Sequence, residues 1–128
     1  MDFRGIDPAA IAETLARFEA GAAEAAARRG VAIGWTSLMR AAPLTVAPEM
    51  VAAAEAAAGA VGVPSRRLTS GASHDANRMA RLCPIGLIFI PCRDGRSHCP
   101  EEWAEVEHLE TGARVLLEVR LRLDRELA

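Results

Sequence analysis

The sequence predicts an α/β fold in which a partial sheet is flanked by helices. Short apolar segments bounded by proline or glycine alternate with longer segments whose apolar residues recur at helical spacing, which is typical of this class. The clearest strand is residues 85–90, which lie between Pro84 and Pro91 and are apolar on both faces, as in a strand buried inside a sheet. A chain of 128 residues forms at most one domain, or a piece of a larger one.

The first third of the chain predicts a short extended segment at residues 2–4, then a helix, then a strand at residues 31–38. Asp7 and Pro8 suit the N-cap and the first position of the helix, and Gly30 suits the residue that ends it. The apolar face of this helix is expected to contain Ile11, Leu15, Phe18 and Ala22.

The middle of the chain predicts two further helices and a strand. An alanine-rich helix is expected to begin at Pro48 and to end near Gly59 or Gly62, with its small side chains packed closely against a sheet. A short strand at residues 66–69 follows. The small-residue loop at residues 70–73 then opens a third helix, from His74 to Leu82.

The last predicted helix runs from Trp103 to about Asp124. Its buried face is expected to consist of Leu109, Ala113, Leu116, Leu117 and Leu121. The acidic residues expected on its solvated face are Glu105, Glu107, Glu110 and Glu118. This helix would cover one side of the sheet.

Composition excludes several classes of partner. The net charge is −2, and the arginines are scattered without aromatic residues between them, so neither nucleic acid nor an anionic membrane is an expected partner. No apolar run reaches the length of a membrane span, and no signal peptide is visible. Three cysteines, an odd number, favour a reducing cytoplasm over a disulfide framework.

Two loops, residues 70–74 and residues 92–102, are expected to leave the same edge of the sheet, where α/β proteins place their ligands. His98 is either a metal ligand or a surface histidine in a polar loop. His74 either lies at the rim of an oxyanion pocket formed by the N–H groups of a helix start, or only caps that helix. Cys92 and Cys99 lack the second pair of ligands that a structural zinc site needs. Alone, the site is short of metal ligands.

Several segments carry a family resemblance. Residues 70–76, Ser-Gly-Ala-Ser-His-Asp-Ala, resemble the S-G-A-G-H-D-A motif of the N-carbamoyl-L-amino-acid hydrolases, in the amidase, hydantoinase and carbamoylase group of the M20 metallopeptidase superfamily. Allantoate amidohydrolase and β-ureidopropionase are close relatives in this group. Residues 79–84, 88–91, 95–102 and 112–117 are similar to later segments of the same family, in the same order. The resemblance covers the whole chain.

The resemblance implies a role for four residues. His98 takes the place of the last ligand of a two-metal centre, and His74 the place of the histidine that contacts the substrate and its oxyanion. The backbone N–H of Ser73, which stands where the motif has glycine, would help to hold the substrate carboxylate. Arg4 matches the arginine of a D-x-R sequence in the lid domain, which binds the same carboxylate.

The resemblance also implies an organisation in two domains. Residues 1–42 would be the C-terminal part of a lid and dimerisation domain, and residues 43–128 the C-terminal part of a catalytic metallohydrolase domain. The cofactor would be a pair of divalent ions, zinc, manganese, nickel or cobalt, whose other ligands lie in segments that this chain lacks. The chain alone is not expected to retain the pair.

The implied activity is hydrolysis of the N-carbamoyl (ureido) C–N bond of N-carbamoyl amino acids or related ureido acids, as in hydantoin utilisation. This 128-residue chain alone is expected to be inactive. Two alternatives stay open: a non-enzymatic remnant, or a split-enzyme subunit that binds a partner chain or a small carboxylate. The full-length family forms homodimers through the lid domain; here self-association or a missing N-terminal partner is expected.

Overall fold

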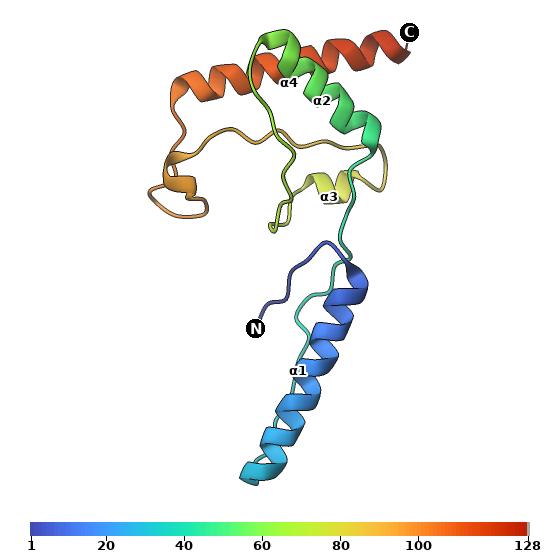
Figure 1. The fold of residues 1–128 in the computed structure, drawn as a ribbon, viewed down its shortest axis with the longest axis vertical. Helices are drawn as coiled ribbons and strands as arrows, with labels where there is room; N and C mark the ends of the chain where they lie inside the picture. The colour runs from blue at the N-terminus through green and yellow to red at the C-terminus, as the bar shows by residue number, and fades with distance from the viewer. Residues whose placement is uncertain (128) are drawn as a thin grey trace. The chain divides into compact units, whose positions relative to one another are not determined.

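The computed structural model describes residues 1–127 and consists of helices joined by long irregular segments (Figure 1). The helices are α1 (Pro8–Arg29), α2 (Pro48–Val61), α3 (Ala76–Met79), the 3-10 helix η1 (Arg93–Gly95) and α4 (Val106–Leu127). No β-strand occurs among the residues described. The predicted α/β class, with a partial sheet flanked by helices, is therefore wrong for this structure.

The segments predicted as strands, residues 31–38, 66–69 and 85–90, are irregular. The N–H and C=O groups of a strand must be paired with a neighbouring strand. Within the described part of the chain, no backbone hydrogen bond involves residues 85–90. Apolar patterning identifies a segment suited to a sheet, but pairing also requires another extended segment in register, and these three segments do not pair with one another.

The chain divides into two compact units. The first contains residues 1–45 and 69–72, and the second contains residues 46–68 and the chain from residue 73 onward. The assignment of residues 1–42 to a lid domain and of residues 43–128 to a catalytic domain stays a prediction.

Helix α1 of the first unit begins and ends where the sequence predicts. The Asp7 side chain accepts a hydrogen bond from the Ala9 N–H at 2.8 Å, which satisfies a free donor at the helix start. Gly30 ends the helix in the left-handed region, at φ 64°. A side chain is strained in this conformation, so glycine is favoured here.

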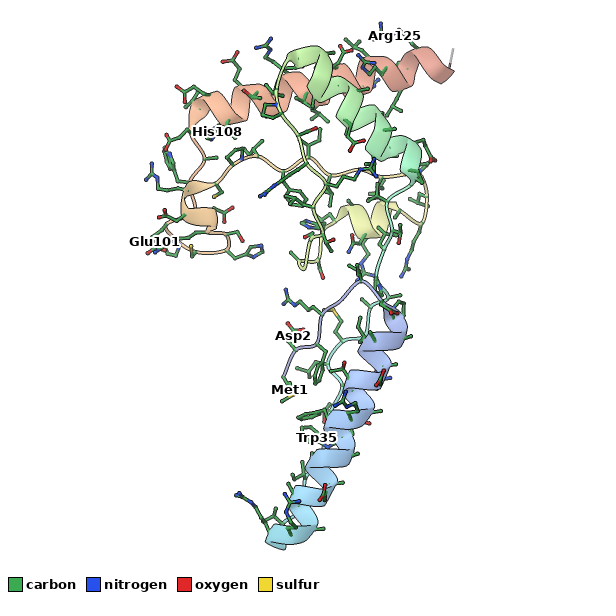
Figure 2. All side chains as sticks on the ribbon, in the orientation of Figure 1. Met1, Asp2, Trp35, Glu101, His108 and Arg125 are labelled. Carbon is green, nitrogen blue, oxygen red and sulfur yellow. The ribbon has the colours of Figure 1, made fainter. Side chains whose placement is uncertain are left out.

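The apolar face of α1 is covered by the segments before and after the helix. The chain after α1 runs back alongside the helix (Figure 1). The Phe18 ring lies 5.6 Å from the Phe3 ring and 5.0 Å from the Trp35 ring, and Figure 2 shows Trp35 beside α1. The four residues predicted for this face, Ile11, Leu15, Phe18 and Ala22, are all half-buried, which confirms the prediction.

Helices α2 and α4 form the core of the second unit. The buried residues of this core are Ala57, Ala58, Val115 and Val119. The side chain of Ala57 is fully covered, and methyl groups at this position and the next let the two helices approach closely. The alanine-rich helix thus packs against a helix rather than against the predicted sheet. Its predicted limits are confirmed, with Pro48 at the first position and Gly62 as the cap at φ 79°.

The predicted buried face of α4 is wrong. Val115 and Val119 face the core, whereas Leu116 and Leu117 are each 60% exposed. The other residues assigned to this face, Leu109, Ala113 and Leu121, are exposed as well. The leucine-rich face was expected to cover the sheet, and the described chain contains no sheet to receive it.

Residues 85–90, which precede the loop at residues 92–102, cross this leucine-rich face of α4. A hollow of about 240 Å³ lies between them, lined by Ile88, Ile90, Leu109, Gly112, Ala113 and Leu116. A Cβ atom at Gly112 would come within 2.6 Å of Cγ2 of Ile90, so only glycine permits this approach. The hollow is apolar and contains no polar group suited to catalysis.

Helix α3 is shorter than predicted. It contains four residues, whereas the sequence predicts a helix from His74 to Leu82. Beyond Met79 the chain continues in turns, with the Leu82 N–H donating to the Met79 carbonyl at 2.8 Å. Pro84 disfavours helical backbone just before it and helps to explain the early end. Among the helices described, none is long and apolar enough to cross a membrane.

Candidate functional site

His74 lies next to the apolar segment at residues 85–90. Its imidazole makes an edge-to-face contact with the Phe89 ring, with centroids 5.8 Å apart and planes inclined by 63°. The side chain is half-buried, while Ser73 beside it is exposed. Because α3 spans only one turn, it has too small a dipole to provide the predicted oxyanion pocket by itself.

The loop at residues 92–105 is closed by its own polar groups. The Arg93 N–H donates to the Trp103 carbonyl at 2.7 Å, which joins the two ends of the loop. The Cys92 thiol donates to the Arg96 carbonyl at 2.8 Å and lies 3.2 Å from the Trp103 carbonyl. No second segment of the chain is needed for this closure.

A charged cluster reinforces the same closure. Nη2 of Arg93 lies 2.9 Å from Oε1 of Glu105, and its guanidinium carbon is 5.6 Å from the centre of the Trp103 ring. The hydrogen bond from Arg93, and then the one from Trp103, lowers the pKa of Glu105. All three side chains are exposed, so these contacts order the loop more than they stabilise the unit.

His98 occupies the tip of this loop in an unusual backbone conformation. Its φ is 58°, which places it in the left-handed region that residues other than glycine seldom adopt. Its N–H donates to Oε2 of Glu102 at 2.7 Å. The residue is exposed, and in the described structure its imidazole has no hydrogen-bonding or ionic partner. The ring is therefore available to a ligand.

Arg4 belongs to the first unit, where it is already paired. Its Nε donates to Oδ2 of Asp2 at 2.7 Å, and its Nη1 donates to the Gly71 carbonyl at 2.8 Å. The hydrogen bond with Arg4 lowers the pKa of Asp2, and the same bond raises the pKa of Arg4. A substrate carboxylate would have to compete with Asp2 for this guanidinium.

The described residues bring together no group of three or more histidine, cysteine or acidic side chains able to hold a metal ion. None of the three cysteines forms a disulfide: the Cys92 thiol donates to the Arg96 carbonyl, and the Cys83 thiol lies 3.8 Å from the Met79 carbonyl. His98 fits the part of a single ligand, because its ring is exposed on an ordered loop. A metal centre would need further ligands from outside this set.

The sequence predicts His98 as a candidate ligand but does not indicate the residues that hold its backbone. In the sequence, Glu102 stands out only as part of the family motif, and Cys92 only as a possible zinc ligand. The available signal was the spacing: a carboxylate four residues after a histidine in a short loop can turn back to the histidine N–H. The contacts of Arg93, Trp103 and Glu105 had no comparable local signal.

The family model described as peptidase family M20/M25/M40 matches residues 6–122 of this chain. The chain therefore belongs to this family.

Within that family, the chain is similar to proteins that are named for hydrolysis of amide-type bonds. An N-carbamoyl-L-amino-acid amidohydrolase of Paenarthrobacter aurescens is 35% identical over 125 residues, which are 98% of this chain and 30% of the relative. The enzyme of the same name from Geobacillus stearothermophilus is 41% identical over 91 residues, 71% of this chain and 22% of the relative.

A third relative carries a different name. An allantoate amidohydrolase of Bacillus subtilis is 32% identical over 96 residues, 75% of this chain and 23% of the relative. The chain thus spans less than a third of the length of each of these relatives. The resemblance to the M20 carbamoylase group is confirmed.

Proposed function

We propose that this chain is a segment of a metal-dependent amidohydrolase that cleaves the N-carbamoyl C–N bond of a small ureido acid. The observation that carries the proposal is the similarity to an N-carbamoyl-L-amino-acid amidohydrolase along 98% of the chain. The exposed His98 ring on a self-closed loop supports it, since a metal ligand must be ordered and accessible.

In this proposal four residues act on the substrate or the metal pair. His98 would be one ligand of the divalent ions, which supply the activated water and polarise the scissile carbonyl. His74 would donate a hydrogen bond to the oxyanion. Arg4 and the Ser73 N–H would hold the substrate carboxylate. Residues 1–42 would belong to the lid domain of the complete enzyme and residues 43–128 to the catalytic domain.

The chain alone would be inactive in this view, because His98 is a single ligand and a catalytic site needs about three protein ligands per ion. We place the protein in the cytoplasm, an assignment supported by the three unpaired thiols. The metal is zinc, manganese, nickel or cobalt, all of which accept an imidazole nitrogen.

A chimera tests this function. The chain would replace the matching segment of the Paenarthrobacter aurescens relative, and hydrolysis of N-carbamoyl amino acids and bound metal would be measured. We expect the chimera to hydrolyse the substrate. We expect its His98→Ala variant to lose this turnover and part of the bound metal. His108→Ala, which changes a half-buried histidine of α4, is the matched control. Full turnover in the His98→Ala chimera would overturn the proposal.

A second candidate is a split-enzyme subunit that binds a partner chain. The exposed leucine-rich face of α4 and the unpaired backbone of residues 85–90 favour it, because both are suited to contact with further polypeptide. Without such a partner, the same surfaces would cause self-association. Zinc or manganese bound stoichiometrically by the purified chain alone, or turnover of N-carbamoyl amino acids by it, would refute the expected inactivity of the isolated chain.

A further inference from the structure

His98 adopts a backbone conformation that must be held in place. A left-handed φ of 58° is sterically unfavourable for histidine, so it persists only where neighbouring groups select it. In the described part of the chain the His98 N–H has one hydrogen-bonding partner, Oε2 of Glu102, at 2.7 Å. This distance is typical of a charge-assisted bond, which is stronger than a bond between neutral groups.

The backbone of Glu102 is itself fixed by the loop. Its N–H donates to the Cys99 carbonyl at 3.0 Å, which forms a turn over residues 99–102. This turn brings the Glu102 carboxylate back toward His98, the residue just before the turn. The Glu102 side chain and the His98 backbone thus close a small ring of contacts at the tip of the loop.

We propose that Glu102 is the positioning residue of His98: its carboxylate captures the His98 N–H and holds the residue left-handed, so that the imidazole extends from the loop toward a ligand. The metal-binding role of that imidazole rests on the proposed function, whereas the positioning rests on the loop geometry alone. Glu102 itself binds no ligand in this scheme.

The contacts that close the loop are distinct from the contact that positions His98. The two ends are joined by the Arg93 N–H and the Cys92 thiol, both of which bond to the Trp103 carbonyl and neither of which contacts Glu102. Removal of the Glu102 carboxylate should therefore release His98 and leave the closure intact. This difference provides an internal control.

The chain also provides a matched control residue. Glu101 carries the same charge one position earlier, and Figure 2 shows it at the same loop. Its carboxylate lies 3.8 Å from Nη1 of Arg96, a loose ion pair that does not involve His98. Substitution of Glu101 thus removes an equal charge without removing the bond to the His98 N–H.

The first test measures amide hydrogen exchange by NMR in the full 128-residue chain. In E102A, exchange at the His98 amide should accelerate about tenfold and its proton resonance should move upfield, while the Arg93 amide keeps its rate. E102Q retains an acceptor oxygen and should restore part of the protection. E101A should match the original chain. Equal rates at His98 in E102A and E101A, or equal acceleration at His98 and Arg93, would overturn the proposal.

The second test addresses the backbone conformation. Glycine adopts a left-handed φ without steric cost, so E102A should accelerate tip exchange less in an H98G background than in the original chain. We measure the amide of residue 102 for this comparison, because its N–H donates to the Cys99 carbonyl at 3.0 Å and so reports the turn at the tip. An E102A effect of the same size in both backgrounds would show that Glu102 does not select the conformation of His98.

The chimera then separates this proposal from the proposed function. E102A in the chimera should weaken metal binding by about 10- to 100-fold and lower kcat with little change in KM, and E101A should change neither. An H98A chimera that keeps its metal and activity refutes the ligand role of His98, although the NMR result for Glu102 could still hold. An unchanged His98 amide in E102A refutes the positioning role whatever the chimera does.

Discussion

Two apolar surfaces of the second unit differ in whether the chain itself covers them. Ala57 of α2 is fully buried against α4, close to Val115. Ile88 and Phe89, in the apolar run at residues 85–90, are 37% and 49% exposed, and the backbone around them has no hydrogen-bonding partner within the described residues. Both segments are strongly apolar in sequence, so hydrophobicity alone does not explain the difference.

The difference lies in how each segment satisfies its backbone. A helix pairs its N–H and C=O groups internally and needs only a complementary face, which α4 provides for α2. A strand must find both a covering layer and a neighbouring strand. In the described residues, the helices therefore find their partners while the strand-like segments do not, and four substitutions test this interpretation.

The largest effect is expected from Ala57→Leu. The larger side chain cannot fit where the two helices meet, and overpacking of this kind costs about 1–3 kcal/mol of unfolding free energy. Urea unfolding followed by circular dichroism measures the loss. Ala56→Leu, at the exposed neighbouring position, is the control and should change stability by less than about 0.5 kcal/mol. Equal losses of unfolding free energy in Ala57→Leu and Ala56→Leu would show that α2 and α4 do not pack tightly at Ala57.

Ile88→Arg tests the surface that the chain leaves open. Because Ile88 is 37% exposed and also lines the hollow against α4, the substitution should cost about 1 kcal/mol of unfolding free energy, less than the cost expected for Ala57→Leu. Self-association should weaken by about tenfold, since an arginine opposes burial of this run between copies. Sedimentation velocity over a concentration series measures the change, with Ser65→Arg as the charge-matched control. A chain that is monomeric before any substitution would contradict the expectation.

Cys92→Ala tests whether the adjoining loop closes by itself. Loss of the thiol donor should cost about 0.5–1.5 kcal/mol of local closure, which corresponds to roughly two- to tenfold faster opening. Trypsin cleavage after Arg93 and Arg96 reports the opening. Cys92→Ser keeps a donor and should restore most of the resistance. Cys83→Ala alters an exposed thiol outside the loop, and cleavage as fast as in Cys92→Ala would refute the assignment.

The smallest effect is an acid response of the same loop. The pKa of Glu105 is lowered by Arg93 from its ordinary value of 4.5, so its contribution to loop closure is complete above that pH and is lost as the pH falls through the lowered value. Fluorescence of Trp103 in a Trp35→Phe background follows the change. Glu105→Gln, which does not titrate, should give a flat profile, and a persisting transition would point to another group.

Features of the chain that depend on neighbours in sequence could be predicted. Asp7, Pro8 and Gly30 define α1 through contacts within a few residues, and Pro48 and Gly62 do the same for α2. The predicted sheet is not formed by the described residues, and this outcome could not be read from the sequence because strand pairing depends on distant segments. The buried face of α4 was misassigned for the same reason, since Leu116 was matched to a sheet that is not formed.

The candidate site also has features that the local sequence predicts and features that it does not. The position of His98 in an exposed polar loop follows from the local sequence, and the structure agrees. Its left-handed backbone and its bond to Glu102 do not follow, because φ at a residue other than glycine is set by the contacts around it. The placement of Arg4 against Asp2 and Gly71 also depends on a contact across 67 positions of the chain.

The thiols on either side of the apolar run offer a direct chemical reporter. Cys83, just before the run, is exposed, whereas the Cys92 thiol, just after it, is engaged with two carbonyl groups. A maleimide dye should therefore attach first at Cys83 and leave Cys92 for last. The fluorescence of a dye at Cys83 should change when another polypeptide binds to residues 85–90. The labelled protein can therefore report the binding of a partner to this run directly.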